Sequence, residues 1–235
     1  MSLNIGYFAD GPWSHQAFDK LINDSDILIK FICVRFDSQD EILKKYCKKY
    51  GIDYLRDRNV NSKKFINKLS EYNCDLFVSM SFNQIFKKEI INLTKYKIIN
   101  CHAGKLPFYR GRNVLNWALI NGEDEFGITV HYVDEGIDTG DIILQDIHSI
   151  SLQDNYSTLL TRSYSGCANI LYKAVALFKN GKVKGSKQKN MHPVGFYCTQ
   201  RKIGDEIINW DDTSINVFNF IRSICHPGPI ARAFI

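Results

Sequence analysis

The stretch KIINCHAGKLPFYRGRN, residues 97–113, starts as an apolar run and ends as a polar turn. The run gives way to Asn100 and His102, and the turn carries the cations Lys105, Arg110 and Arg112. Successive strand side chains point to opposite faces, so Asn100 and His102 share one face. Ligands bind beyond the carboxyl ends of strands in open parallel sheets. The stretch therefore predicts a buried strand that ends in functional groups.

Strand and helix patterns alternate on the amino-terminal side of this stretch. The segment 38–51 has a capping box formed by Ser38 and Glu41, and Gly51 ends it. Apolar runs separated by helices favour a parallel sheet covered on both faces. The strands are expected at 3–8, 26–34, 75–80 and 96–100, and the further helices near 11–22, 62–72 and 84–93.

The carboxyl-terminal side continues with a helix after residue 113, two strands and a long amphipathic helix. These strands are expected at 127–133 and 141–147, the long helix at 156–180, strand-like tail segments at 195–200 and 206–210, and a last helix at 213–224. The predicted fold class is α/β. It is a Rossmann-like, mostly parallel twisted sheet with helices on both faces and a short carboxyl-terminal strand and helix extension.

Composition favours one domain over residues 1–235. The chain is 45% hydrophobic, which suffices for one sizeable core, and its net charge of +5 includes no long basic block. Seven scattered cysteines without a Cys-x-x-Cys pair indicate reduced thiols and no metal site. The start MSLNIGYFAD lacks the features of a signal peptide. A cytoplasmic protein with no membrane insertion is expected.

A second polar turn, DEGIDTGDII, begins at Asp134 and lies between two predicted strands. Its Asp138 would orient His102 and favour the protonated imidazole. Together Asn100, His102 and Asp138 suit direct acyl transfer to an amine, with an amide donor for the oxyanion and an imidazole as acid. Two plainer interpretations stay open. The strand-end pair would satisfy loop backbone groups, and the turn would be an acidic hairpin.

The segments IINCHAGKLPFYRGRN and GITVHYVDEGIDTGDII resemble the 10-formyltetrahydrofolate-dependent formyltransferases. That family combines an Asn-x-His pair, a Leu-Pro and Tyr-Arg-Gly turn and an Asp-x-Gly loop. The resemblance implies the formyltransferase fold, 10-formyltetrahydrofolate as formyl donor, no metal, and Asn100, His102 and Asp138 as catalytic residues. The family's His-Pro-Ser is replaced by His102-Ala103-Gly104.

The resemblance also implies two folate-binding loops that hold the pteridine mainly through backbone groups. One loop corresponds to SFNQIF, residues 81–86, and the other to residues 136–139. Ordinary core packing is the competing interpretation for the apolar members of the first loop. The cofactor-binding residues are expected to be Phe82, Gln84, Ile85, Phe86, Gly136, Ile137 and Thr139.

The stretch YRGRNVLNWALINGE is similar to the sugar N-formyltransferases. The resemblance implies a dTDP-linked acceptor, dTDP-4-amino-4,6-dideoxy-D-glucose, used for bacterial O-antigen and lipopolysaccharide biosynthesis. A tail from about residue 190 would complete the nucleotide-sugar side. The Arg side chains suit phosphate contacts, and aromatic side chains suit stacking. The substrate-binding residues are expected to be Lys105, Tyr109, Arg110, Arg112, Trp117 and Arg201.

The same resemblance leads to expectations about partners. The partners would be the nucleotide sugar, the folate and a second copy of the chain in a homodimer. No nucleic acid partner and no tRNA-binding barrel domain are expected. The alternatives are formylation of another amine, on glycinamide ribonucleotide or Met-tRNA, or a non-catalytic nucleotide-binding module.

Overall fold

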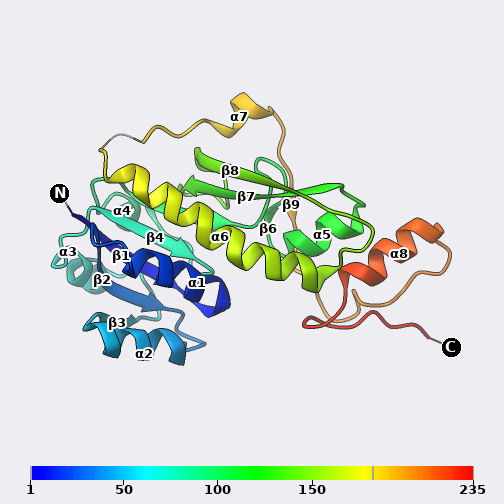
Figure 1. Cartoon of the computed structure of the whole chain (residues 1–235), viewed down its shortest axis with the longest axis horizontal. Coiled ribbons are helices and arrows are strands. Elements are labelled where there is room, and N and C mark those ends of the chain that lie inside the picture. The colour runs from blue at the N-terminus through cyan, green and yellow to red at the C-terminus, as the bar shows by residue number, and fades with distance from the viewer. Residues whose placement is uncertain (1, 182, 235) are drawn as a thin grey trace.

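A seven-stranded sheet forms the centre of the computed structural model, which describes residues 2–181 and 183–234 (Figure 1). The strands lie in the order β3-β2-β1-β4-β5-β7-β8. Neighbours from β3 to β5 are parallel, whereas β7 is antiparallel to both β5 and β8. The predicted mostly parallel α/β sheet is confirmed. The strands are β1 (Leu3–Ala9), β2 (Ile27–Val34), β3 (Asp53–Arg56), β4 (Leu76–Met80), β5 (Ile98–His102), β7 (Glu125–Tyr132) and β8 (Ile142–Ser149).

A second, two-stranded parallel sheet joins β6 (Arg110–Gly111) to β9 (Tyr197–Cys198). This pairing connects the carboxyl-terminal tail, at Tyr197 and Cys198, to the turn that follows β5. In the part of the chain that the structure describes, no helix is long and apolar enough to cross a membrane. The helices are α1 (Gly11–Ile22), α2 (Glu41–Tyr50), α3 (Lys63–Ser70), α4 (Lys88–Ile91), α5 (Val114–Ile120), α6 (Tyr156–Phe178), α7 (Gln188–Met191) and α8 (Ser214–Ser223).

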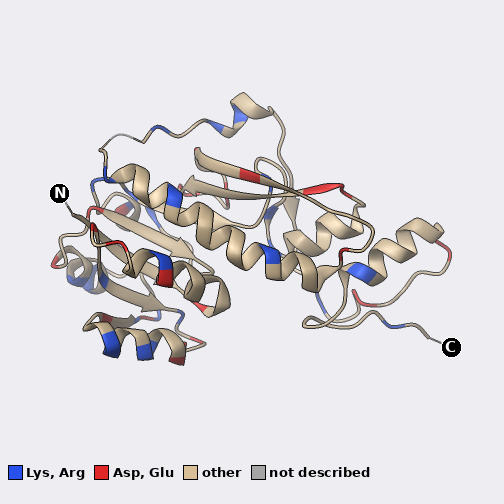
Figure 2. Ribbon diagram, in the orientation of Figure 1, with Lys and Arg blue, Asp and Glu red and all other residues tan. Residues whose placement is uncertain are grey.

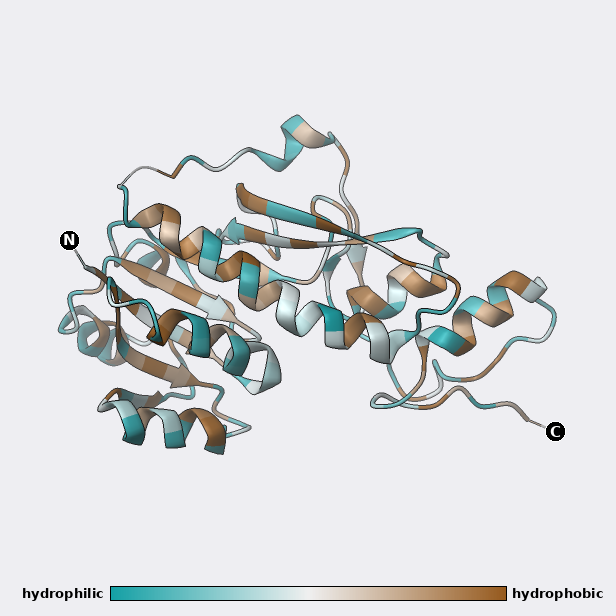
Figure 3. Ribbon diagram, viewed as in Figure 1, coloured by the Kyte–Doolittle hydropathy of each residue, from teal (hydrophilic) through white to brown (hydrophobic). Residues whose placement is uncertain are grey.

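Helices cover both faces of the sheet. Buried residues of α1, α2, α5 and α6 belong to one apolar cluster, whereas those of α3 and α4 belong to a second. Tyr7 and Phe8 are adjacent on β1 and lie in different clusters, because successive strand side chains point to opposite faces. Figure 3 shows hydrophobic colour along much of β2 and β4. Burial on two faces explains why these parallel strands are mostly apolar.

The first turn of α2 differs from the prediction. The N-cap is Asp40, whose Oδ1 accepts hydrogen bonds of 3.0 Å from both Ile42 N and Leu43 N. The predicted capping box of Ser38 and Glu41 is therefore wrong, because the Asp40 carboxylate already satisfies these N–H groups and the Ser38 hydroxyl donates to Asp10. The predicted end at Gly51 is confirmed by its left-handed φ of 65°. The blue bands on α2 in Figure 2 are its lysines.

Three further segments differ from the sequence patterns. Strand β3 is not among the predicted strands. The helix expected at 84–93 shortens to α4, because Asn61 Oδ1 accepts a 2.7 Å hydrogen bond from Lys87 N and holds the preceding chain as a loop. Among the described residues, 206–210 contribute one bridge, Ile207 to Arg232, instead of a strand. The tail is thus less regular than its apolar residues suggest.

Candidate active site

Strand β5 presents Asn100 and His102 on one face and Cys101 on the other. The Cys101 thiol contacts Cys167 O of α6 at 3.7 Å, so the two polar side chains face away from this helix. Asn100 is paired across the sheet with His131 of β7, and His102 is paired with Thr129. The predicted shared face is confirmed. It lies where the sheet changes from parallel to antiparallel pairing.

Asp138 reaches this face from the loop between β7 and β8. Its Oδ2 lies 3.7 Å from His102 Nδ1 and accepts a 2.9 Å hydrogen bond from Gly111 N. Its Oδ1 lies 3.4 Å from His131 Nε2. Burial alone would raise the pKa of the carboxyl group, but His102, His131 and the Gly111 N–H outweigh it and lower the pKa. The carboxylate therefore stays ionised into the acid range.

His131 is the fourth member of the group, and the motifs do not predict it. It is 2% exposed, its Nδ1 lies 2.7 Å from Tyr132 O, and its Nε2 lies 3.3 Å from Asn100 Nδ2. His131 thus bridges Asn100 and Asp138. The available sequence signal is a histidine that interrupts the otherwise apolar strand GITVHYV.

The turn after β5 holds the imidazole of His102. His102 Nε2 lies 2.7 Å from the carbonyl oxygen of Tyr109, which only accepts hydrogen bonds. With Asp138 on the other ring nitrogen, both ring nitrogens of His102 face oxygen atoms that accept hydrogen bonds. Gly104 leaves room for this contact, because a Cβ at that position would overlap Tyr109 O and His102 Nε2. The Gly at this position in His102-Ala103-Gly104 is therefore required by the local packing.

The first predicted folate loop divides its side chains between the core and the solvent. Phe82 and Phe86 stack with ring centroids 5.6 Å apart and pack on Phe8. Gln84 accepts a 3.0 Å hydrogen bond from Val60 N and donates one of 2.9 Å to Asp57 O. Ile85 is 62% exposed. Only Ile85 among these four side chains is directed mainly to solvent.

The second predicted folate loop is closed by Asp134. Gly136 N and the hydroxyl of Thr139 donate hydrogen bonds of 3.1 Å and 2.6 Å to Asp134 Oδ1. Ile137 is 51% exposed. Each loop therefore combines a fixed backbone with one large apolar side chain that is open to solvent.

The six predicted substrate-binding residues lie mostly along the seam between residues 105–117 and the tail. Arg110 contacts Gln188 and lies 5.4 Å from the Tyr197 ring centroid. Trp117 donates to Thr199 O at 2.9 Å. The remaining contacts are Lys105 to Glu125, the Tyr109 hydroxyl to Glu123, Arg112 to Gln200, and Arg201 to Asp205 O and the Trp117 ring. Each residue already has a partner within the protein.

Comparison with known proteins identifies the family. The family model described as formyl transferase matches residues 33–175. A methionyl-tRNA formyltransferase of Fusobacterium nucleatum is 36% identical over 192 residues, which cover 82% of this chain and 60% of the relative. A methionyl-tRNA formyltransferase of Halothermothrix orenii is 30% identical, covering 97% of this chain and 73% of the relative.

A solved structure gives the same fold. The 4-N formyltransferase from Francisella tularensis superposes with a TM-score of 0.77 at 24% identity, covering 96% of this chain and 89% of that one. At this identity the likeness concerns the fold alone. The chain spans only 60% of the length of the Fusobacterium relative.

These relatives correct two expectations. The nucleotide-sugar acceptor and its role in O-antigen synthesis are wrong, and so is the absence of a nucleic acid partner, because the similar curated proteins are named methionyl-tRNA formyltransferases. The nucleotide-sugar acceptor was predicted from residues 109–123, which overlap the motif that predicts the transfer of the formyl group. Enzymes that act on different amines share that step, so the motif does not select the acceptor.

Proposed function

Since this chain belongs to the formyl transferase family, we propose that it transfers a formyl group from 10-formyltetrahydrofolate to the amino group of methionyl-tRNA. The formyl transfer rests on the convergence of Asn100, His102 and Asp138, with Asp138 3.7 Å from His102, whereas the choice of acceptor rests on the relatives named methionyl-tRNA formyltransferases. These residues come from β5 and from the loop between β7 and β8. Their side chains suit an acyl transfer that needs no Ser or Cys nucleophile.

In the proposed reaction the amine attacks the formyl carbon and an oxyanion develops. Asn100 has two amide N–H groups, and its 3.3 Å contact with His131 Nε2 involves at most one of them, so at least one is available to donate to the oxyanion. The protonated His102 adds positive charge and donates a proton to the leaving nitrogen, and the neutral imidazole that results accepts the proton that the attacking amine loses. Asp138 has a lowered pKa and is therefore a weak base. Its role is to stabilise the imidazolium of His102.

We infer that the pteridine ring of the folate binds at the two predicted folate loops. Ile85 and Ile137 are 62% and 51% exposed, and one stands in each loop. We propose that they flank the ring, while backbone groups of both loops bind its polar edge. Phe82, Gln84 and Phe86 would act indirectly, because their contacts fix the first loop to the core.

The acceptor is tested by incubating the purified chain with 10-formyltetrahydrofolate and Met-tRNA. We expect formylmethionyl-tRNA to accumulate with stoichiometric release of tetrahydrofolate. Parallel reactions contain glycinamide ribonucleotide or a dTDP-linked amino sugar. Turnover of either of these, with none on Met-tRNA, would overturn the proposed acceptor and leave the formyl transfer intact. No turnover on any amine would overturn the activity itself.

Three further predictions belong to this proposal, namely a cytoplasmic location, a single catalytic domain and a homodimer. The seven cysteines are unpaired, which supports a reducing, cytoplasmic compartment. A single catalytic domain and a homodimer remain predictions, to be measured by limited proteolysis and by light scattering.

A further inference from the structure

Gln188 is a buried glutamine that lies outside every predicted site. It begins α7 and is 4% exposed. Its Nε2 donates hydrogen bonds of 2.8 Å to the carbonyl oxygens of Asp138 and Gly140. Its Oε1 accepts bonds of 3.1 Å and 2.6 Å from Nε and Nη2 of Arg110. The amide thus uses both N–H groups and both lone-pair directions.

The partners determine which way this amide points. Carbonyl oxygens only accept hydrogen bonds, and a guanidinium only donates them, so Nε2 must face Asp138 and Oε1 must face Arg110. A carboxylate or an apolar side chain at this position would leave two buried carbonyl groups without a donor. Such groups are costly to bury unpaired.

The two turns that Gln188 joins are those that hold the catalytic groups. Arg110 stands between Tyr109, whose carbonyl contacts His102 at 2.7 Å, and Gly111, whose N–H donates to Asp138 at 2.9 Å. On the other turn, Asp138 has a φ of 53°, in the left-handed region that non-glycine residues rarely occupy. Gln188 therefore fastens a strained loop to the turn that its carboxylate must face.

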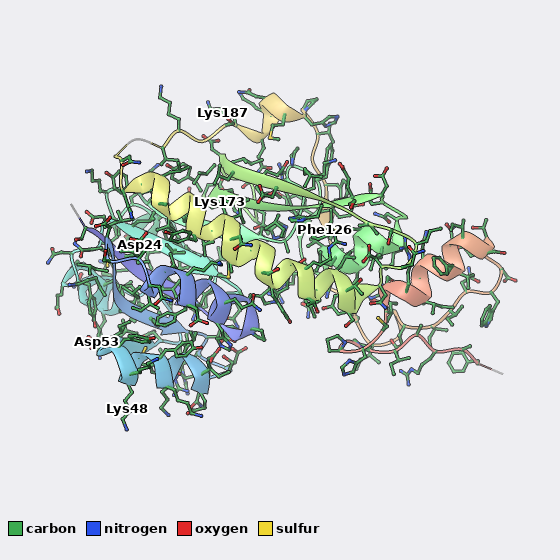
Figure 4. The ribbon with its side chains drawn as sticks, in the orientation of Figure 1. Asp24, Lys48, Asp53, Phe126, Lys173 and Lys187 are labelled. Carbon is green, nitrogen blue, oxygen red and sulfur yellow. The ribbon has the colours of Figure 1, made fainter. Side chains whose placement is uncertain are left out.

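The position of Gln188 does not depend on these side-chain contacts. Ser186 and Ile142 exchange backbone hydrogen bonds of 2.8 Å and 2.9 Å, and the Tyr132 hydroxyl donates to Val183 O at 2.9 Å. Figure 4 labels Lys187, the residue before Gln188, on the chain that runs beside β8. Backbone pairing thus brings this segment to the loop, and among residues 2–181 and 183–234 the Asp138 carbonyl accepts its hydrogen bond from the Gln188 amide.

We propose that Gln188 is a positioning residue for formyl transfer, because it holds the Asp138 loop against the Arg110 turn and so sets the approach of the Asp138 carboxylate to His102. The inference rests on the proposed function. It assigns a role to a tail residue that lies 50 positions from Asp138 and 78 from Arg110 in the sequence.

The test compares Gln188→Met, Gln188→Glu and the control Gln200→Met in the whole chain. Gln200 is an exposed glutamine whose Oε1 accepts one bond of 3.2 Å from Arg112, so it matches the chemistry without touching the Asp138 loop. We expect Gln188→Met to lower kcat at least tenfold with KM within about twofold. The acid limb of the pH profile should move to higher pH, because a looser Asp138 loses groups that lower its pKa. Gln200→Met should change neither quantity.

Gln188→Glu separates positioning from simple packing. It preserves the shape and the acceptor for Arg110 but removes both donors at neutral pH. Protonation restores one O–H donor, so we expect the activity ratio of Gln188→Glu to Gln188→Met to rise as the pH falls. A purely structural role would leave this ratio constant. Wild-type kcat and an unshifted acid limb in Gln188→Met would overturn the inference.

A second measurement does not require turnover. The imidazole C–H resonances of His102 are followed through a pH titration, assigned by their loss in His102→Gln. We expect the titration to change in Gln188→Met and to stay as in the wild type in Gln200→Met. Equal curves in all three proteins would overturn the inference even if no amine is formylated. If Gln188→Met does not fold, the same comparison is made with Gln188→Glu.

Discussion

The helices α6 and α8 use their apolar side chains in opposite ways. On α6, Leu159, Ile170 and Leu171 are 0% exposed and pack behind the strands that carry Asn100 and His131. On α8, the buried side chains are the polar Asn219 and Ser223, whereas three of its large apolar side chains are exposed. The exposed side chains are Ile215 at 54%, Phe218 at 42% and Ile221 at 42%.

Polar contacts hold α8 in place. Asn116 of α5 donates a 2.7 Å hydrogen bond to Ser223 O, and Arg222 donates to Asn219 Oδ1 at 2.9 Å and to Ser151 O at 2.7 Å. Arg222 is the one charged residue of α8 (Figure 2). Burial of apolar side chains thus stabilises the sheet side, which is the sheet together with α6. A few directed hydrogen bonds stabilise the tail side, which is α8 and the segments around it.

The largest effect is expected where the sheet side is most deeply buried. Leu171→Ala removes a side chain that is 0% exposed, and lost burial plus the resulting cavity should lower the free energy of unfolding by about 2–5 kcal/mol. Urea denaturation of both proteins measures this difference. A loss below about 1 kcal/mol would mean that α6 is not the supporting helix, and the contrast with α8 would fail.

The next effect concerns the chemistry that the sheet side positions. Asn100→Ala removes an oxyanion donor and should lower turnover by about 10²–10³, equivalent to about 2.7–4 kcal/mol of barrier. Initial rates with Met-tRNA and 10-formyltetrahydrofolate measure it, with urea denaturation as the control for folding. Turnover near that of the wild type would remove Asn100 from the reaction.

A smaller effect is expected in the turn that links the two sides. Gly104→Ser places a Cβ against Tyr109 O and His102 Nε2, and overpacking of this kind costs about 1–3 kcal/mol. We expect lower turnover together with lower stability, because the His102 ring must move. Unchanged kinetics would show that the turn accommodates the side chain freely and that His102 is not held there.

The pH dependence of stability should differ between the two sides. Asp138 has a lowered pKa in the folded protein, so its contribution is present above the unfolded pKa of about 3.9 and is lost as the pH falls toward the folded value. The stability difference between the wild type and Asp138→Asn should therefore shrink as the pH is lowered through this window, as urea denaturation at several pH values would show. Asp212 of the tail also has a lowered pKa, through Asn216 and Thr213 N, but it is exposed. Asp212→Asn should show a weaker pH dependence, and an equal one would contradict the contrast.

The smallest effect is expected on the exposed face of α8. Phe218→Ser exchanges an exposed apolar side chain for a polar one, so the free energy of unfolding should change by no more than about 0.5 kcal/mol. Urea denaturation at several protein concentrations tests this. A loss of several kcal/mol, or one that depends on concentration, would show that a partner covers this face.

Periodicity and strand ends predict much of this molecule. The apolar runs identify β1, β2, β4 and β5, and the polar end of β5 identifies Asn100 and His102. The Asp-x-Gly loop identifies Asp138. His131 and Gln188 are beyond such inference, because their contacts depend on the register of β7 against β5 and on a backbone bridge between Ser186 and Ile142. The histidine in GITVHYV marks His131 as unusual, but no local pattern specifies the residues that His131 and Gln188 contact.

The amino-acid sequence by itself determined the alternating α/β order and the faces of the parallel strands, including the face that Asn100 and His102 share. These follow from local rules, because strand and helix periods act between neighbouring residues. Tertiary structure alone decided that His131 joins the site, that Gln188 fastens the Asp138 loop and that α8 exposes its apolar side. Each of these depends on which distant surfaces meet, and apolar spacing in a helix does not specify the surface it will meet.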